Sequence, residues 1–430
     1  MHKYRLPPAL SLLIVALLLA AGACQRATPT PTATPLPSPT PTVLPATASF
    51  PLGEQALEWA RRLVALSPRD TRSGNEGRAA QFLQQALADM GYRVRLHQFP
   101  VTLVQSQISL LAPQERVVEG AHMLRSGEGT VEGEVVFVGL GRREDIPKDG
   151  LAGKVALADR GDITFQEKAQ AVAEAGARAL LVANNQPGLF QGALQERASV
   201  PVLGISQEDG QSLKAMLAQG AVRMRVQVWS QDYPSQNVVA ERVGTAPSPK
   251  VVLITAHYDT VPDVPGANDN ASGVAAVLTL AQLLKERSWP FTVRLIAFGG
   301  EEEGLWGSRA YVQSLPREEH QLILGVLNLD VVGAVADLAV AGDPALIQMV
   351  SDVARAAGIP LRAIGLQEAA SDHLPFLQAR IPAVILTTPD FQRIHTPEDR
   401  LEFLDIESLD ATIRLVEAVI QRWASGEGGG

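Results

Sequence analysis

The sequence VVLITAHYDTVPDVPGANDNASG, at residues 251–273, holds the first chemical signal in the chain. Its opening run of apolar and small residues is typical of a buried strand, and this run ends at His257 and Asp259. Prolines and a glycine then predict a loop. Asn268, Asp269 and their neighbours offer N-cap chemistry before an apolar run with helical spacing. The stretch therefore predicts a strand, a crossover loop and a helix.

The two ends of this crossover carry metal-binding chemistry. In an open α/β sheet, ligands bind at the carboxyl ends of the strands, where such crossovers lie. The His257 imidazole and the Asp269 carboxylate are donors that Zn²⁺ commonly uses, and Asp259 is spaced to hold the second ring nitrogen of His257. A His-x-Asp triplet by itself also fits an ordinary polar loop. The metal-site hypothesis therefore depends on partners elsewhere in the chain.

Length and composition describe a globular protein with room for two domains. The chain has 430 residues, of which 46% are hydrophobic and 19% are charged. Its net charge of −9, without a clustered basic face, argues against nucleic acid as a partner. Cys24 is the single cysteine, so no intramolecular disulfide can form.

The N-terminal region predicts export. Residues 1–23 combine a basic start, an apolar centre and a small-residue end, as a signal peptide does. Cys24 follows directly and resembles the acylated cysteine of the bacterial lipoprotein lipobox, which predicts a membrane anchor. Ala21 stands where the lipobox prefers a larger aliphatic residue, and ordinary signal peptidase could cleave the same bond, so secretion is the alternative. The rest of residues 24–51 is rich in Thr and Pro and predicts an extended tether.

A second domain is expected at residues 105–234, where strand-like and helix-like runs alternate without any ligand or nucleophile pattern. The sequences GKVALADRGDITFQEKAQAVAEAGARALLVANN and SVPVLGISQEDGQSL within it resemble the protease-associated domain that is inserted in many exopeptidases. In those relatives the insert is a lid or a substrate-shaping module. A purely structural domain is the alternative, because a fold match does not locate a site.

The remaining segments, residues 52–104 and 235–425, are expected to form the main domain, followed by a flexible tail at 426–430. Apolar strand runs alternate there with helix-period runs. This order predicts an α/β fold, with a mostly parallel sheet covered by helices on both faces.

Further candidate ligands follow other predicted strands of this domain. Glu301, Glu302 and Glu303 come two glycines after one strand, and neighbouring residues there point to opposite sides, so one glutamate can bind metal while the next faces water. Asp330 ends another apolar run, and His395 lies in a loop. Each alone fits a solvated turn, a strand cap or a plain loop. Together with the first stretch they supply donors for two divalent ions, one carboxylate bridging.

These motifs resemble those of one peptidase family. HYDTVPDVPGANDNASG, FGGEEEGLWGSRAYV, LNLDVVG, SDHLPF and IHTPEDR are similar, in this order, to the motifs of the secreted di-zinc exopeptidases, metallopeptidase family twenty-eight. That family includes bacterial leucyl aminopeptidases and glutamate carboxypeptidases. The resemblance covers about residues 52–423 and implies the zinc exopeptidase fold, two Zn²⁺ ions per chain and a peptide as substrate.

The resemblance also implies a role for each motif residue. Asp269 would bridge the ions; His257 and Asp330 would complete one ion, and Glu302 and His395 the other. The general base would be Glu301, with Asp259 orienting His257. The spacing to Gly304, Leu305, Gly307 and Ser308 selects Glu301 and Glu302 from the three consecutive glutamates.

The SDHLPF motif is implied to line the substrate pocket through Ser371, Asp372 and His373. A serine-hydrolase triad is the rival interpretation. It is disfavoured because sequence neighbours rarely converge as nucleophile, base and orienting residue, and because the chain has no Gly-x-Ser-x-Gly elbow.

The implied reaction is hydrolysis of N-terminal residues from peptides by metal-activated water, with Glu301 as the base. A carboxypeptidase is the first alternative and would need a cationic pocket, for which Arg160, Arg197 and Arg309 are available. A single-metal acyltransferase resembling the glutaminyl cyclases is the second, and a surface binding module with a dead site is the third. The motifs leave side-chain preference and oligomeric state open.

Overall fold

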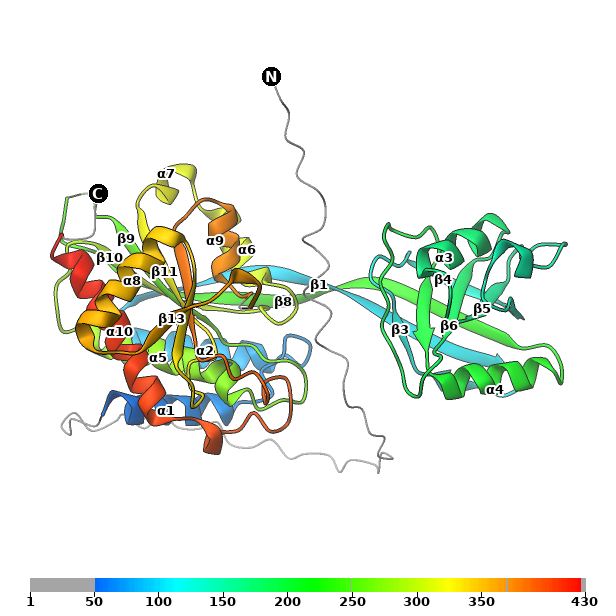
Figure 1. Cartoon of the computed structure of the whole chain (residues 1–430), viewed down its shortest axis with the longest axis horizontal. Coiled ribbons are helices and arrows are strands. Elements are labelled where there is room, and N and C mark those ends of the chain that lie inside the picture. The colour runs from blue at the N-terminus through cyan, green and yellow to red at the C-terminus, as the bar shows by residue number, and fades with distance from the viewer. Residues whose placement is uncertain (1–50, 248, 369, 427–430) are drawn as a thin grey trace, which may run out of the picture. The chain divides into compact units, whose positions relative to one another are not determined.

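A computed structural model of the chain describes residues 51–247, 249–368 and 370–426 (Figure 1). The predicted signal peptide, Cys24 and the tether up to residue 50 lie outside the described residues, as do residues 427–430. Among the described helices, none has the length and apolar character needed to cross a membrane.

The described chain divides into two compact units. The larger comprises residues 51–101 and 233–426, and the smaller comprises residues 102–232. The chain passes between them within two long strands, β1 (Arg93–Ala112) and β8 (Arg223–Arg242), which pair with each other. The expected domain boundaries at 104/105 and 234/235 fall inside these two strands.

The sheet of the larger unit confirms the mostly parallel arrangement predicted from the sequence. Four parallel strands form its centre, and β8 lies antiparallel against one side of them. On the other side one further strand runs antiparallel to the centre and pairs with a short parallel neighbour at the edge. The strand order is β13 (Leu361–Ala363), β12 (Leu338–Gly342), β14 (Ala383–Thr387), β11 (Ile323–Leu329), β9 (Val251–His257), β10 (Thr292–Phe298) and β8.

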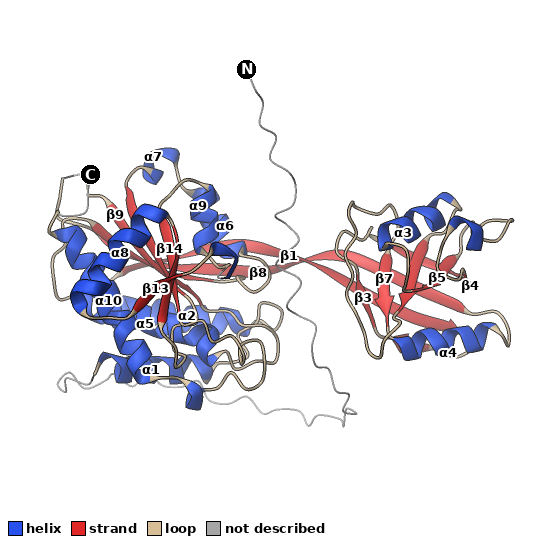
Figure 2. Ribbon diagram, viewed as in Figure 1, coloured by secondary structure: helices blue, strands red, loops and turns tan. Residues whose placement is uncertain are grey.

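Helices cover both faces of this sheet (Figure 2). All seven residues of β9 are buried, as is usual for a parallel strand with a core on each side. Val252 and Ile254 face one core, whereas Val251 and Leu253 face the other. The first core includes α1 (Leu52–Val64), α2 (Asn75–Asp89), α5 (Ser272–Leu284), α8 (Pro344–Ala357) and α10 (Ile406–Ala424); the second includes α6 (Trp306–Ser314) and α9 (His373–Gln378).

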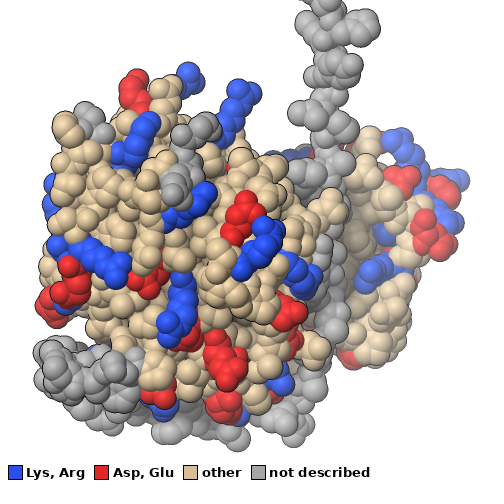
Figure 3. Space-filling view, turned by 60° about the vertical axis from the view of Figure 1, so that its left-hand side comes forward, with Lys and Arg blue, Asp and Glu red and all other residues tan. Residues whose placement is uncertain are grey.

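Short elements complete the larger unit: helix α7 (Arg317–His320) and the single turns Ala267–Ala271, Leu366–Glu368 and Leu401–Phe403. On the face of this unit seen in Figure 3, acidic and basic side chains are interspersed.

The smaller unit is a second, separate α/β sandwich. Its sheet has the order β8, β4 (Gly129–Phe137), β5 (Val155–Asp159), β6 (Ala179–Ala183), β7 (Val202–Ile205) and β3 (Gly120–His122), with β4 to β7 parallel. Helix α3 (Phe165–Glu174) packs on one face of this sheet and α4 (Gln207–Leu217) on the other. The strand β2 (Arg116–Val118) pairs with β1, and Arg143–Asp145 forms a single turn.

Candidate metal centre

The predicted ligands meet because three parallel strands end at the same edge of the larger sheet. His257 is the last residue of β9 and is paired with Phe298, the last residue of β10. Two glycines after Phe298 lead to Glu301, and Asp330 directly follows β11. The rule that parallel strands present their carboxyl ends together thus places side chains from three different motifs at one point.

Asp269 lies between two imidazoles. Its Oδ1 is 3.0 Å from His257 Nε2 and its Oδ2 is 3.1 Å from His395 Nε2. Asp330 Oδ1 lies 3.2 Å from the same nitrogen of His257, and Glu302 Oε2 lies 3.0 Å from His395 Nε2. The five side chains predicted as ligands therefore form one continuous cluster, with a two-oxygen carboxylate in the middle.

Two groups of donor atoms in this cluster are compact enough to share a metal ion. The donors of His257, Glu301 and Asp330 converge within 4.8 Å of one another, and so do those of His257, Asp269 and Glu302. Nitrogen and carboxylate oxygen donors in this mixture suit Zn²⁺.

The charges of the cluster also fit a cation. Burial raises the pKa of Glu302 to about 7 and raises that of Glu301 well above its usual range. Hydrogen bonds with Asp269 and Glu302 raise the pKa of His395 to about 11. The buried Oε1 of Glu302 has no hydrogen-bond partner among the described residues. A bound cation stabilises buried carboxylates that lie close together, and it can also bind the carboxylate oxygen that has no hydrogen-bond partner. The residues present therefore fit a bound metal.

Asp259 supports the cluster from behind. Its Oδ1 lies 3.6 Å from His257 Nδ1, on the side of the ring away from Asp269. Its two oxygens also accept hydrogen bonds from the backbone N–H groups of Glu301 and Glu302, each at 3.1 Å. One buried carboxylate thus faces the imidazole and fixes the turn that carries both glutamates.

The crossover loop is held by side chains rather than by the simple helix cap expected from its sequence. Asp269 has non-helical dihedral angles, φ −116° and ψ 91°, and α5 begins only at Ser272. Asn270 Oδ1 accepts from the N–H of Gly273 at 2.9 Å, which leaves the carboxylate of Asp269 to face the imidazoles. The carboxylate of Asp399 accepts the N–H groups of Asn268 and Asp269, at 2.7 and 3.0 Å.

Ser371, Asp372 and His373 are buried at the start of α9, but they do not form a catalytic triad. The Ser371 hydroxyl accepts a hydrogen bond from Asn328 Nδ2 at 2.9 Å, and neither ring nitrogen of His373 has a partner among the described residues. Burial raises the pKa of Asp372 to about 7 and lowers that of His373 to about 4. The serine-hydrolase interpretation therefore lacks its hydrogen-bond chain.

Two residues around the centre escaped the sequence analysis. Arg69 and Glu76 come from the segment around the start of α2, and both are buried. Glu76 accepts a hydrogen bond from Ser235, and its pKa is raised to about 8, mainly by burial. A Cβ atom on Gly299 would lie 2.2 Å from Glu76 Oε1, so only glycine fits before the glutamate turn. A third residue, Asp399, stood in a recognised motif but had been given no role.

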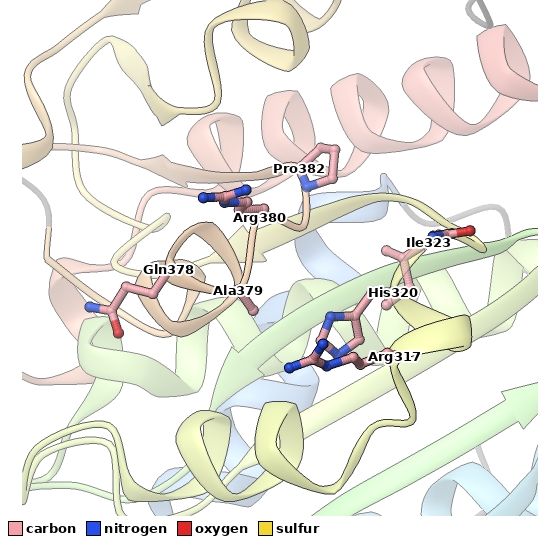
Figure 4. Close-up of a pocket in the computed structure, with 8 residues that line it drawn as sticks. Arg317, His320, Ile323, Gln378, Ala379, Arg380 and Pro382 are labelled. Atoms are coloured by element: carbon pink, nitrogen blue, oxygen red, sulfur yellow. The ribbon is translucent and has the colours of Figure 1, made fainter. Parts of the chain in front are cut away.

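A surface cavity lies away from this centre (Figure 4). It has a volume of about 750 Å³ and is lined by Arg317, His320 and Arg380, among others. Ile323 and Pro382 in its lining stand at the amino ends of β11 and β14. This cavity is therefore at the edge of the sheet opposite His257.

Comparison with known proteins agrees with this geometry. Residues 237–420 match Peptidase family M28, and residues 131–213 match the PA domain. Aminopeptidase YwaD of Bacillus subtilis (strain 168) is 30% identical over 374 residues, which cover 83% of this chain and 81% of YwaD. The chain belongs to peptidase family M28. The expected protease-associated insert is confirmed as well.

Solved structures resemble this M28 peptidase over most of its length. BSAP, a zinc aminopeptidase from Bacillus subtilis, superposes with a TM-score of 0.69 at 28% identity, covering 88% of this chain and 96% of BSAP. The aminopeptidase from Aneurinibacillus sp. strain AM-1 superposes with a TM-score of 0.64 at 29% identity, covering 86% of this chain and 93% of the other.

Proposed function

We propose that this M28 peptidase is a zinc aminopeptidase that binds two Zn²⁺ ions and removes N-terminal residues from peptides. The observation that carries the proposal is Asp269, whose two oxygens face the imidazoles of His257 and His395 separately. Relatives named as an aminopeptidase and as a zinc aminopeptidase, which align with most of this chain, support the same activity.

Each side chain of the cluster has a proposed place in the centre. His257 and Asp330 would hold one ion, Glu302 and His395 the other, and Asp269 would contact both. Bound Zn²⁺ would lower the pKa of a coordinated water and polarise the scissile carbonyl group.

Glu301 is the proposed general base. Its carboxyl group belongs to the compact group of donors with His257 and Asp330. Burial raises its pKa well above the usual range, so it binds a proton more tightly than an exposed carboxylate does. Glu301 would accept the proton of the attacking water and give it to the departing amine. Asp259 would keep Glu301 in place through its backbone N–H.

The arginines near the centre favour an aminopeptidase over a carboxypeptidase. A peptide amino group needs no cationic partner in the site. A substrate carboxylate would instead need a free cation. Arg69 is the buried guanidinium of this region, and backbone carbonyls and a hydroxyl already engage each of its nitrogens. Arg309, one of the arginines considered from sequence, is exposed on α6.

A pair of blocked peptides tests the polarity. The purified protein is incubated with Leu-p-nitroanilide, with an N-acetylated peptide and with a C-amidated peptide of the same sequence, each with and without a chelator. We expect chelator-sensitive release from Leu-p-nitroanilide and from the amidated peptide only. Cleavage of the acetylated peptide alone would establish a carboxypeptidase, and no hydrolysis of any substrate would favour a binding module.

We also propose, from the sequence alone, that the protein is exported and anchored to a membrane through Cys24. The experiment is expression of the full chain with Cys24→Ser. The activity should move from the membrane fraction to the soluble extracytoplasmic fraction. An unchanged distribution would contradict the anchor.

A further inference from the structure

A buried arginine, Arg69, makes an unusual set of contacts next to the metal centre. Its side chain is fully enclosed, between the end of α1 and the start of α2. Nε donates to the carbonyl of Tyr258 at 2.7 Å, and Nη2 donates to the carbonyl of Gly266 at 2.9 Å. Nη1 donates to the carbonyl of Pro265 at 3.0 Å and to Ser67 Oγ at 2.5 Å.

These carbonyls lie at the two ends of the crossover between β9 and α5. Tyr258 directly follows His257, and Gly266 comes three residues before Asp269. One guanidinium therefore joins the backbone beside the first predicted ligand to the backbone near the bridging carboxylate. The planar fork of arginine can do this because it presents several donors in fixed directions, whereas the ammonium group of lysine is a single point.

The charge of Arg69 is not explained by an ion pair. Its hydrogen-bond acceptors are neutral, and no described carboxylate forms a salt bridge with it. Burial lowers its pKa to about 10, so it remains charged at neutral pH. Burying such a charge is costly unless something compensates. The carboxylates of the centre, Asp259 and Asp269 among them, supply that compensation from a longer range.

The loop around the guanidinium is closely fitted. The backbone N–H of Arg69 donates to Thr260 Oγ1 at 3.0 Å, and Ser67 Oγ donates to the carbonyl of Pro265 at 2.6 Å. Gly266 has φ +62°, and a Cβ atom there would lie 2.3 Å from Thr260 Cγ2 and 3.0 Å from Arg69 Nη2. The crossover therefore passes directly against the guanidinium, with no room for a side chain at Gly266.

We propose that Arg69 is a positioning residue for the metal centre. By binding carbonyls at both ends of the crossover, it fixes the distance and direction between His257 and Asp269 before any metal binds. This inference rests on the proposed function, because the two side chains need a fixed separation only if they share a metal ion. If Arg69 has this role, metal binding depends on the several hydrogen bonds of its guanidinium group, and the positive charge of a lysine does not replace them.

Cobalt binding to the full chain tests this role without relying on turnover. Metal-free wild-type protein, Arg69→Lys and Arg69→Met are titrated with Co²⁺, and the visible absorption spectrum of the bound ion is recorded. Arg294 provides the matched control, since it is also largely buried but is bonded to Glu241, Glu319 and the Tyr311 hydroxyl on the other face of the sheet. Its variants are Arg294→Lys and Arg294→Met.

For both Arg69 variants, the Co²⁺ concentration at half-saturation should rise about tenfold or more, and the visible absorption spectrum of the bound ion should change. The Arg294 variants should unfold at lower temperature but bind Co²⁺ as the wild type does. Wild-type affinity and spectrum in the Arg69 variants would overturn the inference, as would equal losses of affinity at both arginines.

A milder variant covers the case in which Arg69 variants do not fold. Ser67→Ala removes one acceptor of Nη1 and one donor to Pro265. It should weaken Co²⁺ binding in the same direction by a smaller factor, and unchanged binding would overturn the role of Arg69. A wild-type protein that takes up no Co²⁺ would overturn the proposed function itself, and this inference with it.

Discussion

Both units place a carboxylate at the carboxyl end of a parallel strand, but only one of them builds a site there. In the smaller unit β5 ends at Asp159, whose two oxygens accept hydrogen bonds from Lys214 Nζ at 2.8 and 3.1 Å. In the larger unit β9 ends at His257, whose imidazole faces the carboxylates of Asp269 and Asp330, and the second oxygen of Asp269 faces the imidazole of His395. A strand end therefore provides only a location. A carboxylate paired there with a lysine is held in an ion pair, whereas carboxylates that face imidazoles form a set of metal donors.

Burial sharpens this difference. The side chain of Asp159 is 35% exposed, whereas those of Asp269 and Glu302 are each 7% exposed. Water and Lys214 already stabilise the carboxylate of Asp159, so a bound metal ion would add little stability there. The other two are held close together out of water, and this arrangement favours metal binding. Substitutions in both units test this difference.

The largest effect is expected from Asp269→Ala. Removing the carboxylate between His257 and His395 should abolish the bridged metal pair. Turnover should then fall by more than the roughly 10²–10⁴-fold that general acid–base catalysis contributes alone. Metal content and the rate of peptide hydrolysis are measured together. Asp159→Ala serves as the control and should keep the metal content and the rate of peptide hydrolysis of the wild type. Retained metal in Asp269→Ala would refute the bridging role.

A smaller loss is expected from Glu301→Gln, which removes the proton acceptor and keeps the shape of the side chain. Turnover should drop by about 10²–10⁴-fold while metal content stays unchanged. Glu303→Gln is the matched control from the same turn, because Glu303 forms an ion pair with Arg72 instead of entering the cluster. A dead Glu303 variant beside an active Glu301 variant would show that the catalytic pair has been assigned one register too early.

Glu76 offers a pH test of burial. Its folded pKa of about 8 lies above the ordinary value of 4.5, so the folded protein binds the extra proton between these pH values. The stability from this neutral acid is complete below pH 4.5 and is lost as pH rises through 8, by roughly 1.4 kcal/mol per pH unit at most. Urea unfolding of the metal-free protein should therefore show a steeper loss from pH 5 to 8 than Glu76→Gln shows. Parallel curves would contradict the assignment.

The smallest effect is expected in the smaller unit. Lys214→Met breaks the pair with Asp159, and both side chains are about a third exposed. The free energy of unfolding should fall by about 1 kcal/mol or less, and the rate of peptide hydrolysis should not change. Loss of hydrolysis in this variant would mean that the strand end of the smaller unit takes part in the reaction after all.

The sequence indicated for a physical reason that the side chains of the cluster would lie together. Apolar runs that end in His257, Glu301 and Asp330 are strand-end signals, and parallel strands bring their ends together. Arg69 left no such signal, since its partners are backbone carbonyls that any residue could offer. Its role depends on the path of the crossover in three dimensions.

The residue pattern of the main domain predicts strands at 92–99 and 236–241, and both are too short. The structure extends them to β1 and β8, which run through Pro100 and Pro234. Proline normally marks the end of a paired strand in sequence, so pairing between distant segments was missed. The antiparallel β12 and its short neighbour β13 were not predicted either, because each is only a few residues long.

In the proposed centre, one buried carboxylate organises two metal ions. The most direct measurement is the zinc content per chain of the purified protein, compared with that of His395→Ala. We expect two ions per wild-type chain and one per chain of the variant, because the variant loses a ligand of only one ion. A single ion in the wild type that is retained in His395→Ala would contradict the account.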